Sequence, residues 1–307
     1  MELKTKGSEH LYTFEPVIGK LKLLKVPFGD AWTGVVLYDG ERKILIDSGA
    51  KDSDVDEVIL PALRQEGYTL RDVDYLLNTH SHGDHIGGFA RIRELAPDIC
   101  VAAAETDWQN VENPAALAIR TRGKFPAVSP KPQSELRGVK VDRILRDGDV
   151  LDGLLTLVTT PGHDGGCVCW IDRETGTAVT GDSLQGNGTP SQGIGFYKDL
   201  NLYRHSVEKL LGMGVENLLC GHDYDRVGYR IFGKDAVRET LDRCLALTVS
   251  YQKFVDRELA AGNADPVEIA AKLIRKAGCG MPAYLFMAVW SVTEHIRLSE
   301  ITLKPFL

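Results

Sequence analysis

Three histidines and an aspartate lie within six positions of one another in the segment THSHGDHIGG, residues 79–88. Alternate side chains of an extended chain project to the same side, so His80 and His82 are expected to point together. A turn at the glycine that follows would redirect Asp84 and His85 to a neighbouring point. Imidazole and carboxylate groups together suit zinc, iron or manganese. The spacing therefore favours two adjacent metal ions over one.

Three more candidate ligands follow short turns that contain glycine. They are His163 in TTPGH, Asp182 in TGDSL and His222 in LLCGH. Each comes directly after an apolar run, and functional residues at the ends of strands are typical of layered α/β folds. Ordinary packing or capping would need a separate explanation for each of these histidines. A metal site explains all of them at once.

The elements that must position these residues alternate short apolar runs with Gly, Asp and Pro turn signals. We expect strands near residues 20–27, 33–40, 42–49, 73–80, 154–163, 175–184 and 215–225, and helices near 55–68 and 87–96. Beyond residue 234 the periodicity is helical over 234–262, 265–278 and 283–298. The second of these begins with Asp265 as N-cap and Pro266 at the first helical position. The prediction is an α/β unit over residues 1–234 and a helical cap over 235–307.

Two segments could shape a substrate cavity. Tyr284, Phe286, Met287 and Trp290 form an apolar stripe in the last expected helix. Helix packing is the usual role of such a stripe, and lining a cavity above the metals, with Trp290 touching substrate, is the alternative. His295, on the same helix, is expected at the surface. The long Pro-rich segment 112–140 is a candidate mobile lid.

Composition excludes several classes of protein. The formal net charge of −7 argues against a general nucleic-acid binder. The longest apolar run, MPAYLFMAVW, has ten residues, whereas a membrane span needs about 20. Residues 1–10 lack the apolar stretch of a secretory signal. The six cysteines are scattered without zinc-finger spacing, which is typical of reduced thiols. We therefore expect a cytoplasmic protein without a membrane or nucleic-acid partner.

The order HSHGDH, PGH, GDS and CGH resembles the metallo-β-lactamase superfamily of metal-dependent hydrolases over about residues 20–230. The upstream ILIDSG, which contains Asp47, is similar to that family as well. The resemblance implies a four-layer αββα sandwich with a dinuclear site at its edge. It assigns His80, His82 and His163 to one metal, Asp84, His85 and His222 to the other, and Asp182 to both as a bridge.

This assignment implies a mechanism. A hydroxide shared by the two metals would attack an acyl carbonyl, and the metals would stabilise the oxyanion that develops. Asp84 would orient the nucleophile as well as bind metal. Asp47 is a candidate for holding a ligand histidine in place, with capping of the turn before Ser48-Gly49 as the alternative. Zinc is the expected metal, and iron and manganese suit the same ligands.

The branches of the family differ in residues that this chain can be checked for. Antibiotic-degrading members lack an aspartate at the position of Asp182. Acyl-homoserine lactonases share the ligand order but carry a tyrosine where this chain has Gln185. The segment CGHDYD is most similar to hydroxyacylglutathione hydrolases, which are thioesterases with a C-terminal helical domain. That similarity makes Tyr224 a candidate substrate contact, with packing beneath the site as the alternative. Cys167 stands where those enzymes have a second histidine.

The prediction is therefore a dinuclear metal-dependent hydrolase of an ester or thioester, with a small-molecule acyl substrate. Whether it forms a homodimer stays open. A lactonase of the same family is one alternative. A mononuclear iron persulfide dioxygenase, which uses only the first ligand set, is another. A structural or sensory metal site is disfavoured, because structural zinc sites are normally closed with four ligands.

Overall fold

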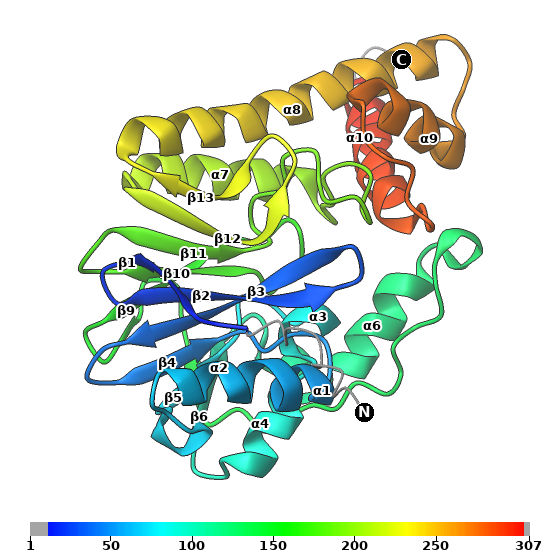
Figure 1. The fold of residues 1–307 in the computed structure, drawn as a ribbon. Coiled ribbons are helices and arrows are strands. Elements are labelled where there is room, and N and C mark those ends of the chain that lie inside the picture. Colours follow the sequence, from blue (N-terminus) through cyan, green and yellow to red (C-terminus); the bar gives the residue numbers. More distant parts are fainter. Residues whose placement is uncertain (1–11, 304–307) are drawn as a thin grey trace, which may run out of the picture.

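The structure is a computed structural model that describes residues 12–303, with side chains to residue 299. Residues 1–10, which bear on the predicted lack of a signal, lie outside this part. Two mixed β-sheets pack face to face, and helices cover the outer face of each sheet (Figure 1). The chain thus forms the expected αββα sandwich with helices at its C-terminal end.

The first sheet has seven strands in sequence order. They are β1 (Glu15–Ile18), β2 (Leu21–Phe28), β3 (Ala31–Asp39), β4 (Lys43–Ile46), β5 (Tyr75–Leu77), β6 (Cys100–Ala104) and β7 (Arg143–Leu145). Strands β1 to β4 pair antiparallel and β4 to β7 pair parallel. The four strands expected in this region are present. The short strands β1, β6 and β7 were not predicted.

The second sheet has six strands in the order β13-β12-β11-β10-β9-β8. They are β8 (Val150–Leu151), β9 (Leu155–Thr159), β10 (Val168–Asp172), β11 (Thr177–Gly181), β12 (Asn217–Tyr224) and β13 (Gly228–Phe232). Strands β11 and β12 are parallel, and the helix α7 (Leu200–Met213) connects them. Between the sheets, Leu23, Val36 and Ile46 of the first pack in one core with Leu157 and Trp170 of the second.

Short helices cover the outer face of the first sheet. They are α1 (Asp52–Asp54), α2 (Leu60–Gln65), α3 (Gly83–Ile86) and α4 (Phe89–Leu95). The helix predicted over 55–68 is interrupted by a π-helical turn, Val55–Ile59, in which Leu60 N donates to Val55 O. The next residue, Pro61, has no N–H to donate and clashes with the preceding turn of a regular helix. The proline explains why this helix is not uniform.

The segment 112–140 is only partly a loop. It follows α5 (Trp108–Glu112) and contains α6 (Pro114–Gly123) and a 3₁₀ turn, Pro126–Val128. Asn113 caps α6 by accepting a hydrogen bond from Ala116 N at 3.2 Å, and Pro114 occupies a first-turn position where a missing N–H is harmless. The first half of the segment is therefore helical, and its role as a mobile lid stays a prediction.

Three helices complete the chain: α8 (Lys234–Ala260), α9 (Pro266–Ala277) and α10 (Phe286–Leu303). The first part of α8 packs Val237 and Leu241 into the core of the second sheet. Its last part packs Tyr251 and Val255 against α9 and α10. Because one helix serves both cores, the cap is continuous with the sandwich (Figure 1). The division at residue 234 stays a prediction.

The expectation that His295 lies at the surface was wrong. Its side chain is fully buried and points from α10 toward α8 and the segment that precedes α7. The Nε2 atom lies 2.6 Å from the Tyr197 hydroxyl, and Nδ1 lies 2.8 Å from Gln252 Oε1. Val292, one turn earlier on α10, is buried as well, so both occupy the inner face of the helix.

Two further expectations concern membrane-spanning helices and the state of the cysteines. Among the helices that the structure describes, none combines the length and apolarity needed to cross a bilayer. All six cysteines are free thiols, of which four are buried, while Cys100 and Cys279 are partly exposed.

Candidate metal centre

The seven candidate ligands come together where strands of both sheets give way to loops. His80 and His82 follow β5, Asp84 and His85 lie on α3, His163 follows β9, Asp182 follows β11, and His222 lies in β12. The chain does turn into a helix at Gly83, as the spacing of the motif suggests. Five of the seven side chains are buried, and His82 and Asp84 are partly exposed.

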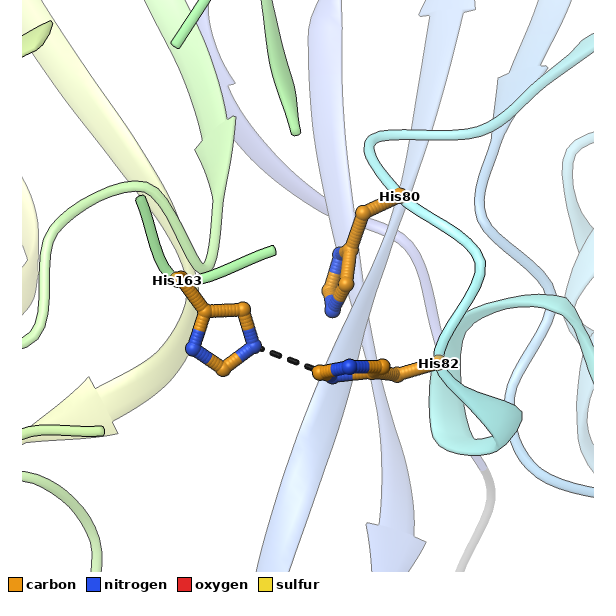
Figure 2. A group of neighbouring side chains, drawn as sticks. All are labelled: His80, His82 and His163. Atoms are coloured by element: carbon orange, nitrogen blue, oxygen red, sulfur yellow. Dashed lines mark hydrogen bonds between the residues drawn. The ribbon is translucent and has the colours of Figure 1, made fainter. Parts of the chain in front are cut away.

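One group of ligand atoms comes from three histidines. The rings of His80, His82 and His163 converge on one point, as Figure 2 shows. His82 Nδ1 lies 3.0 Å from His163 Nε2, and one nitrogen of each ring lies within 4.8 Å of the others. The Oδ2 atom of Asp182 is 3.4 Å from His163 Nε2 and 3.9 Å from His80 Nε2.

A second group adjoins the first and contains Asp84, His85 and His222. His222 Nε2 lies 3.2 Å from Asp84 Oδ2 and 3.3 Å from His85 Nε2. The other oxygen of Asp182, Oδ1, is 3.2 Å from His85 Nε2 and 3.5 Å from His222 Nε2. The two oxygens of Asp182 therefore face different groups of ligands.

The donor set fits metal cations. Among the described side chains, the buried atoms His80 Nε2 and Asp182 Oδ1 have no hydrogen-bond partner. Buried polar atoms are rarely left without a partner, because the loss of solvation is costly. Burial favours the neutral form of Asp182, but the charges of His222 and His85 hold its pKa well below its usual range. Neutral imidazoles and ionised carboxylates are the forms that bind zinc, iron or manganese.

Hydrogen bonds on the outer side of the rings orient the histidines. His163 Nδ1 lies 2.8 Å from the Phe196 carbonyl, and His222 Nδ1 lies 2.7 Å from the Trp32 carbonyl. Since a carbonyl only accepts, each Nδ1 carries a proton, which leaves the lone pair on Nε2 of the neutral ring for a metal ion. The ring of His82 has the opposite orientation, because its Nδ1 atom faces His163 and its Nε2 atom faces Asp164.

Asp47 holds His85 from behind. One carboxylate oxygen of this buried residue accepts from Thr79 N at 2.8 Å, and the other accepts from Thr79 Oγ1 and His85 Nδ1 at the same distance. The backbone of Asp47 is left-handed, with φ of 66°, which is uncommon outside glycine. The contact with His85 matches the supporting role considered for Asp47, and its contacts with Thr79 brace the segment that leads to His80.

Replacing Asp47 with asparagine is expected to weaken metal binding about 10–100-fold, the usual effect of losing such a partner. An amide presents N–H groups to donors that need an acceptor, so His85 would lose its orientation. Competition between the protein and a chelating dye measures the affinity. Asp72→Asn, which alters an exposed carboxylate that caps the turn after Thr69, is the matched control. An Asp47→Asn variant with the control's affinity would contradict the supporting role.

Two residues that support His82, Asp164 and Lys198, were not predicted from the sequence. Asp164 Oδ2 lies 3.1 Å from His82 Nε2 and also accepts from Lys198 Nζ. Burial alone would raise the pKa of Asp164, but Lys198 and His82 hold it well below its usual range. Asp164 directly follows His163, so its position was a detectable signal. No motif near Lys198 in the sequence indicates that it lies at the site.

Asp107 supports the histidine segment from the other side. Its buried carboxylate accepts hydrogen bonds from Ser81 Oγ at 2.6 Å and Asn78 Nδ2 at 2.7 Å. Burial raises the pKa of Asp107 to about 7, although these hydrogen bonds oppose the shift. The residue lies beyond β6, 22 positions after His85 in the sequence. Only the pairing of β5 with β6 brings it close.

A cavity of about 260 Å³ opens above the ligands. Its floor includes His82, Asp84 and His222, and its walls come from the segment around α6 and from residues 283–287 before and within α10. Tyr284, Phe286 and Met287 line it, so three residues of the predicted apolar stripe face the site rather than serving only in packing.

Tyr224 and Trp290 are not among the described residues that line the cavity. The Trp290 indole donates to the Lys198 carbonyl at 3.2 Å and packs edge-on against Phe125. Tyr224 is buried beneath the site, and its hydroxyl accepts a long hydrogen bond, 3.4 Å, from Gln185 Nε2. This placement agrees with the packing alternative for Tyr224. Direct substrate contact by either residue stays a prediction.

The model of the Metallo-beta-lactamase superfamily matches residues 26–222. A hydroxyacylglutathione hydrolase from Cereibacter sphaeroides is 30% identical over 173 residues, which cover 56% of each chain. A beta-lactamase-like protein 2 homolog from Caenorhabditis elegans is 27% identical over 191 residues, 61% of this chain and 54% of that one. The chain thus spans about half the length of these curated relatives.

Among solved structures, a metallo-beta-lactamase family protein from Thermus thermophilus superposes with a TM-score of 0.71. The two chains are 22% identical, and the match covers 92% of this chain and 94% of the other. At this identity the likeness concerns the fold, and it includes the C-terminal helices because nearly the whole chain is aligned.

Proposed function

Since this chain belongs to the metallo-β-lactamase superfamily, we propose that it is a dinuclear metal-dependent hydrolase of ester or thioester bonds. One observation carries the dinuclear part. The two oxygens of Asp182 face separate groups of ligands, with Oδ2 toward His163 and Oδ1 toward His85. A carboxylate placed in this way can bind two ions at once, whereas a single ion would leave one group of ligands without use.

The proposed ligands are those of the sequence analysis. His80, His82 and His163 would hold one ion, Asp84, His85 and His222 the other, and Asp182 both. Bound divalent ions would supply an activated water at neutral pH and polarise the acyl carbonyl. The protein would fix the direction of attack through Asp84, which lies on the cavity floor 3.2 Å from His222 Nε2. Asp47 and Asp164 would keep the ligand rings in place.

The cavity supports an acyl substrate with an apolar part. Phe28, Leu117, Phe196, Phe286 and Met287 contribute to its walls. Burial of apolar substrate groups against such walls is favourable and excludes bulk water from the carbonyl. The sequence similarity to a hydroxyacylglutathione hydrolase favours an ester or thioester over a β-lactam.

The proposal does not extend to glutathione thioesters. Binding of the glutathione carboxylates would need a basic cluster, and the C-terminal helix α9 carries one that consists of Lys272, Arg275 and Lys276. None of the three is among the described residues that line the cavity. Lys272 pairs instead with Glu258 and Glu268, each at 2.9 Å. This cluster is better explained as a solvated helix face.

The first experiment measures the metal content of the purified, unchelated protein and its activity on thioesters, simple esters and lactones. About two ions per chain with thioester or ester hydrolysis would support the proposal. Chelation should abolish turnover, and restored metal should recover it. One iron per chain, with oxygen uptake on persulfides, would favour the dioxygenase. Activity on lactones alone would favour the lactonase. Two ions without turnover of any substrate would contradict an enzymatic role.

A further inference from the structure

Arg122, near the C-terminal end of α6, lines the cavity above the candidate ligands. It is the only lysine or arginine among the described residues that do so. The side chain is partly buried, and burial lowers its pKa while the charges of Glu135 and Asp84 oppose this shift. Within residues 12–303, however, Arg122 forms no ion pair within 4 Å, unlike Arg91 or Arg137 on the exterior.

Hydrogen bonds hold the guanidinium in position. Arg122 Nη2 donates to Gln133 Oε1 at 2.9 Å, and Nη1 donates to the Lys131 carbonyl. Both acceptors are neutral. A guanidinium has five N–H donors, so several remain for a further partner. The group is therefore fixed in place without having its charge neutralised.

The position of Gln133 relates the guanidinium to the metal centre. A Cβ atom placed on Gly83 would lie 2.8 Å from Gln133 Oε1, so this amide rests against the turn between His82 and Asp84. One side chain thus separates Arg122 from the ligand-bearing turn. Arg122 and the candidate ligands border the same small cavity, whose other walls are largely apolar.

A partly buried cation without an anionic partner is costly unless a ligand supplies the anion. The acids on the cavity floor, Asp84 and Asp182, are engaged with histidines. A guanidinium presents its donors in a planar fork that matches a carboxylate. An incoming carboxylate would gain a charge-assisted contact without displacing a protein partner.

We propose that Arg122 binds a carboxylate on the substrate, so that the preferred substrates are esters or thioesters whose acyl chain carries a second, ionised carboxyl group. This inference rests on the proposed hydrolase function. It assigns the apolar walls to the hydrocarbon part of the acyl chain, the metal centre to its scissile carbonyl, and Arg122 to its anionic end.

The test compares two substrates of equal chain length on the metal-loaded protein. One is p-nitrophenyl hexanoate, which is neutral, and the other is the mono-p-nitrophenyl ester of adipic acid, which carries a carboxylate. The wild type should favour the adipate ester in kcat/KM. In Arg122→Gln the ratio of the two kcat/KM values should fall about 10–100-fold, as expected for a lost hydrogen-bonded charge. The change should lie mainly in KM, and Arg122→Lys should recover part of it.

Arg120→Gln is the matched control. Arg120 lies two residues earlier on the same helix, is exposed, and donates to Asn110 Oδ1 at 3.0 Å. This variant should keep the wild-type substrate ratio. Circular dichroism and metal content establish that each variant is folded and loaded. An unchanged ratio in Arg122→Gln, or an equal fall for both esters, would overturn the inference.

Binding measured without turnover separates this inference from the proposed function. Calorimetric titration with adipate and hexanoate should show tighter binding of adipate to the wild type, with the advantage lost in Arg122→Gln. If neither ester is hydrolysed but this advantage is present and depends on Arg122, the hydrolase proposal fails and the carboxylate site stands. If both esters are hydrolysed without preference and adipate binds no better, the carboxylate site fails and the hydrolase stands.

Discussion

Replacing Asp182 with asparagine is expected to lower ester or thioester hydrolysis at least about a thousand-fold, since metal ions supply several kcal/mol of transition-state stabilisation. The metal content should also fall below the wild-type value. An amide has one oxygen, and its NH₂ group would face imidazole nitrogens that lie 3.2–3.5 Å from Asp182 Oδ1. Steady-state kinetics and elemental analysis of the same preparation measure both effects.

Asp223→Asn controls for the loss of one negative charge in this region. Asp223 follows His222 directly in β12, but its side chain is exposed on the other side of the strand. This variant should keep both metal content and turnover. An Asp182→Asn protein with full metal content and near wild-type turnover would show that this carboxylate does not join two ions.

Acidification is expected to destabilise the protein through His295. Burial lowers the pKa of His295 to about 3, with the charge of Arg204 adding to the effect, whereas an unfolded histidine titrates near 6.5. Above pH 6.5 both states are neutral, and the histidine contributes no pH dependence. As the pH falls from 6.5 toward 3, the unfolded state binds a proton that the folded state rejects. The free energy of unfolding should then decrease by about 1.4 kcal/mol per pH unit.

The hydrogen bonds of His295 explain this preference for the neutral form. Gln252 Oε1 accepts from Nδ1, and the Tyr197 hydroxyl is placed to donate to Nε2. A second proton on the ring would remove the acceptor for Tyr197 and bury a charge. Tyr197 follows Phe196, whose carbonyl orients His163. Acid should therefore loosen the attachment of the C-terminal helices close to the metal centre.

Urea unfolding at a series of pH values tests this, with wild type and His295→Gln in the same metal state. The variant should be less stable at neutral pH by about 1–3 kcal/mol, because a buried partner is left unsatisfied. Its stability should nevertheless fall less steeply between pH 6.5 and 4.5 than that of the wild type. His205→Gln, which changes an exposed histidine on α7, should follow the wild type. Parallel curves for wild type and His295→Gln would refute the role of His295.

Local spacing was sufficient to identify the candidate ligands. The motif around His80 and His85 spans six residues, so its geometry depends on one strand end and one helical turn. The downstream ligands follow apolar runs whose length and composition identify strands. Seven of the thirteen strands in the described part of the chain were predicted for the same reason, because burial imposes a periodicity on each element. The buried strand β10 and the helix α7 were not predicted. Short edge strands such as β1 and β7 carry too few buried residues to show it.

Composition is ambiguous where a residue type has more than one structural use. Prolines in the segment 112–140 suggested a mobile lid, and the structure shows that one of them, Pro114, opens α6, the helix that carries Arg122. Trp290 shares a helix face with Phe286 by its spacing of four residues, but the Lys198 carbonyl captures its indole N–H outside the cavity lining. Hydrogen-bond partners such as this carbonyl are remote in the sequence, so no pattern along the chain predicts them.

Short-range spacing and periodicity were thus enough to identify an α/β unit, the helical C-terminal part and the set of candidate ligands, and the resemblance to the metallo-β-lactamase superfamily supplied the sandwich. The folded chain was needed to show that the two oxygens of Asp182 face different groups of ligands, that His295 is buried, and that Arg122 borders the cavity without an acidic partner. The difference has a physical cause. Strands and turns follow from neighbours within a few residues, whereas the direction of a side chain and the supply of its charge partner depend on segments that only packing brings together.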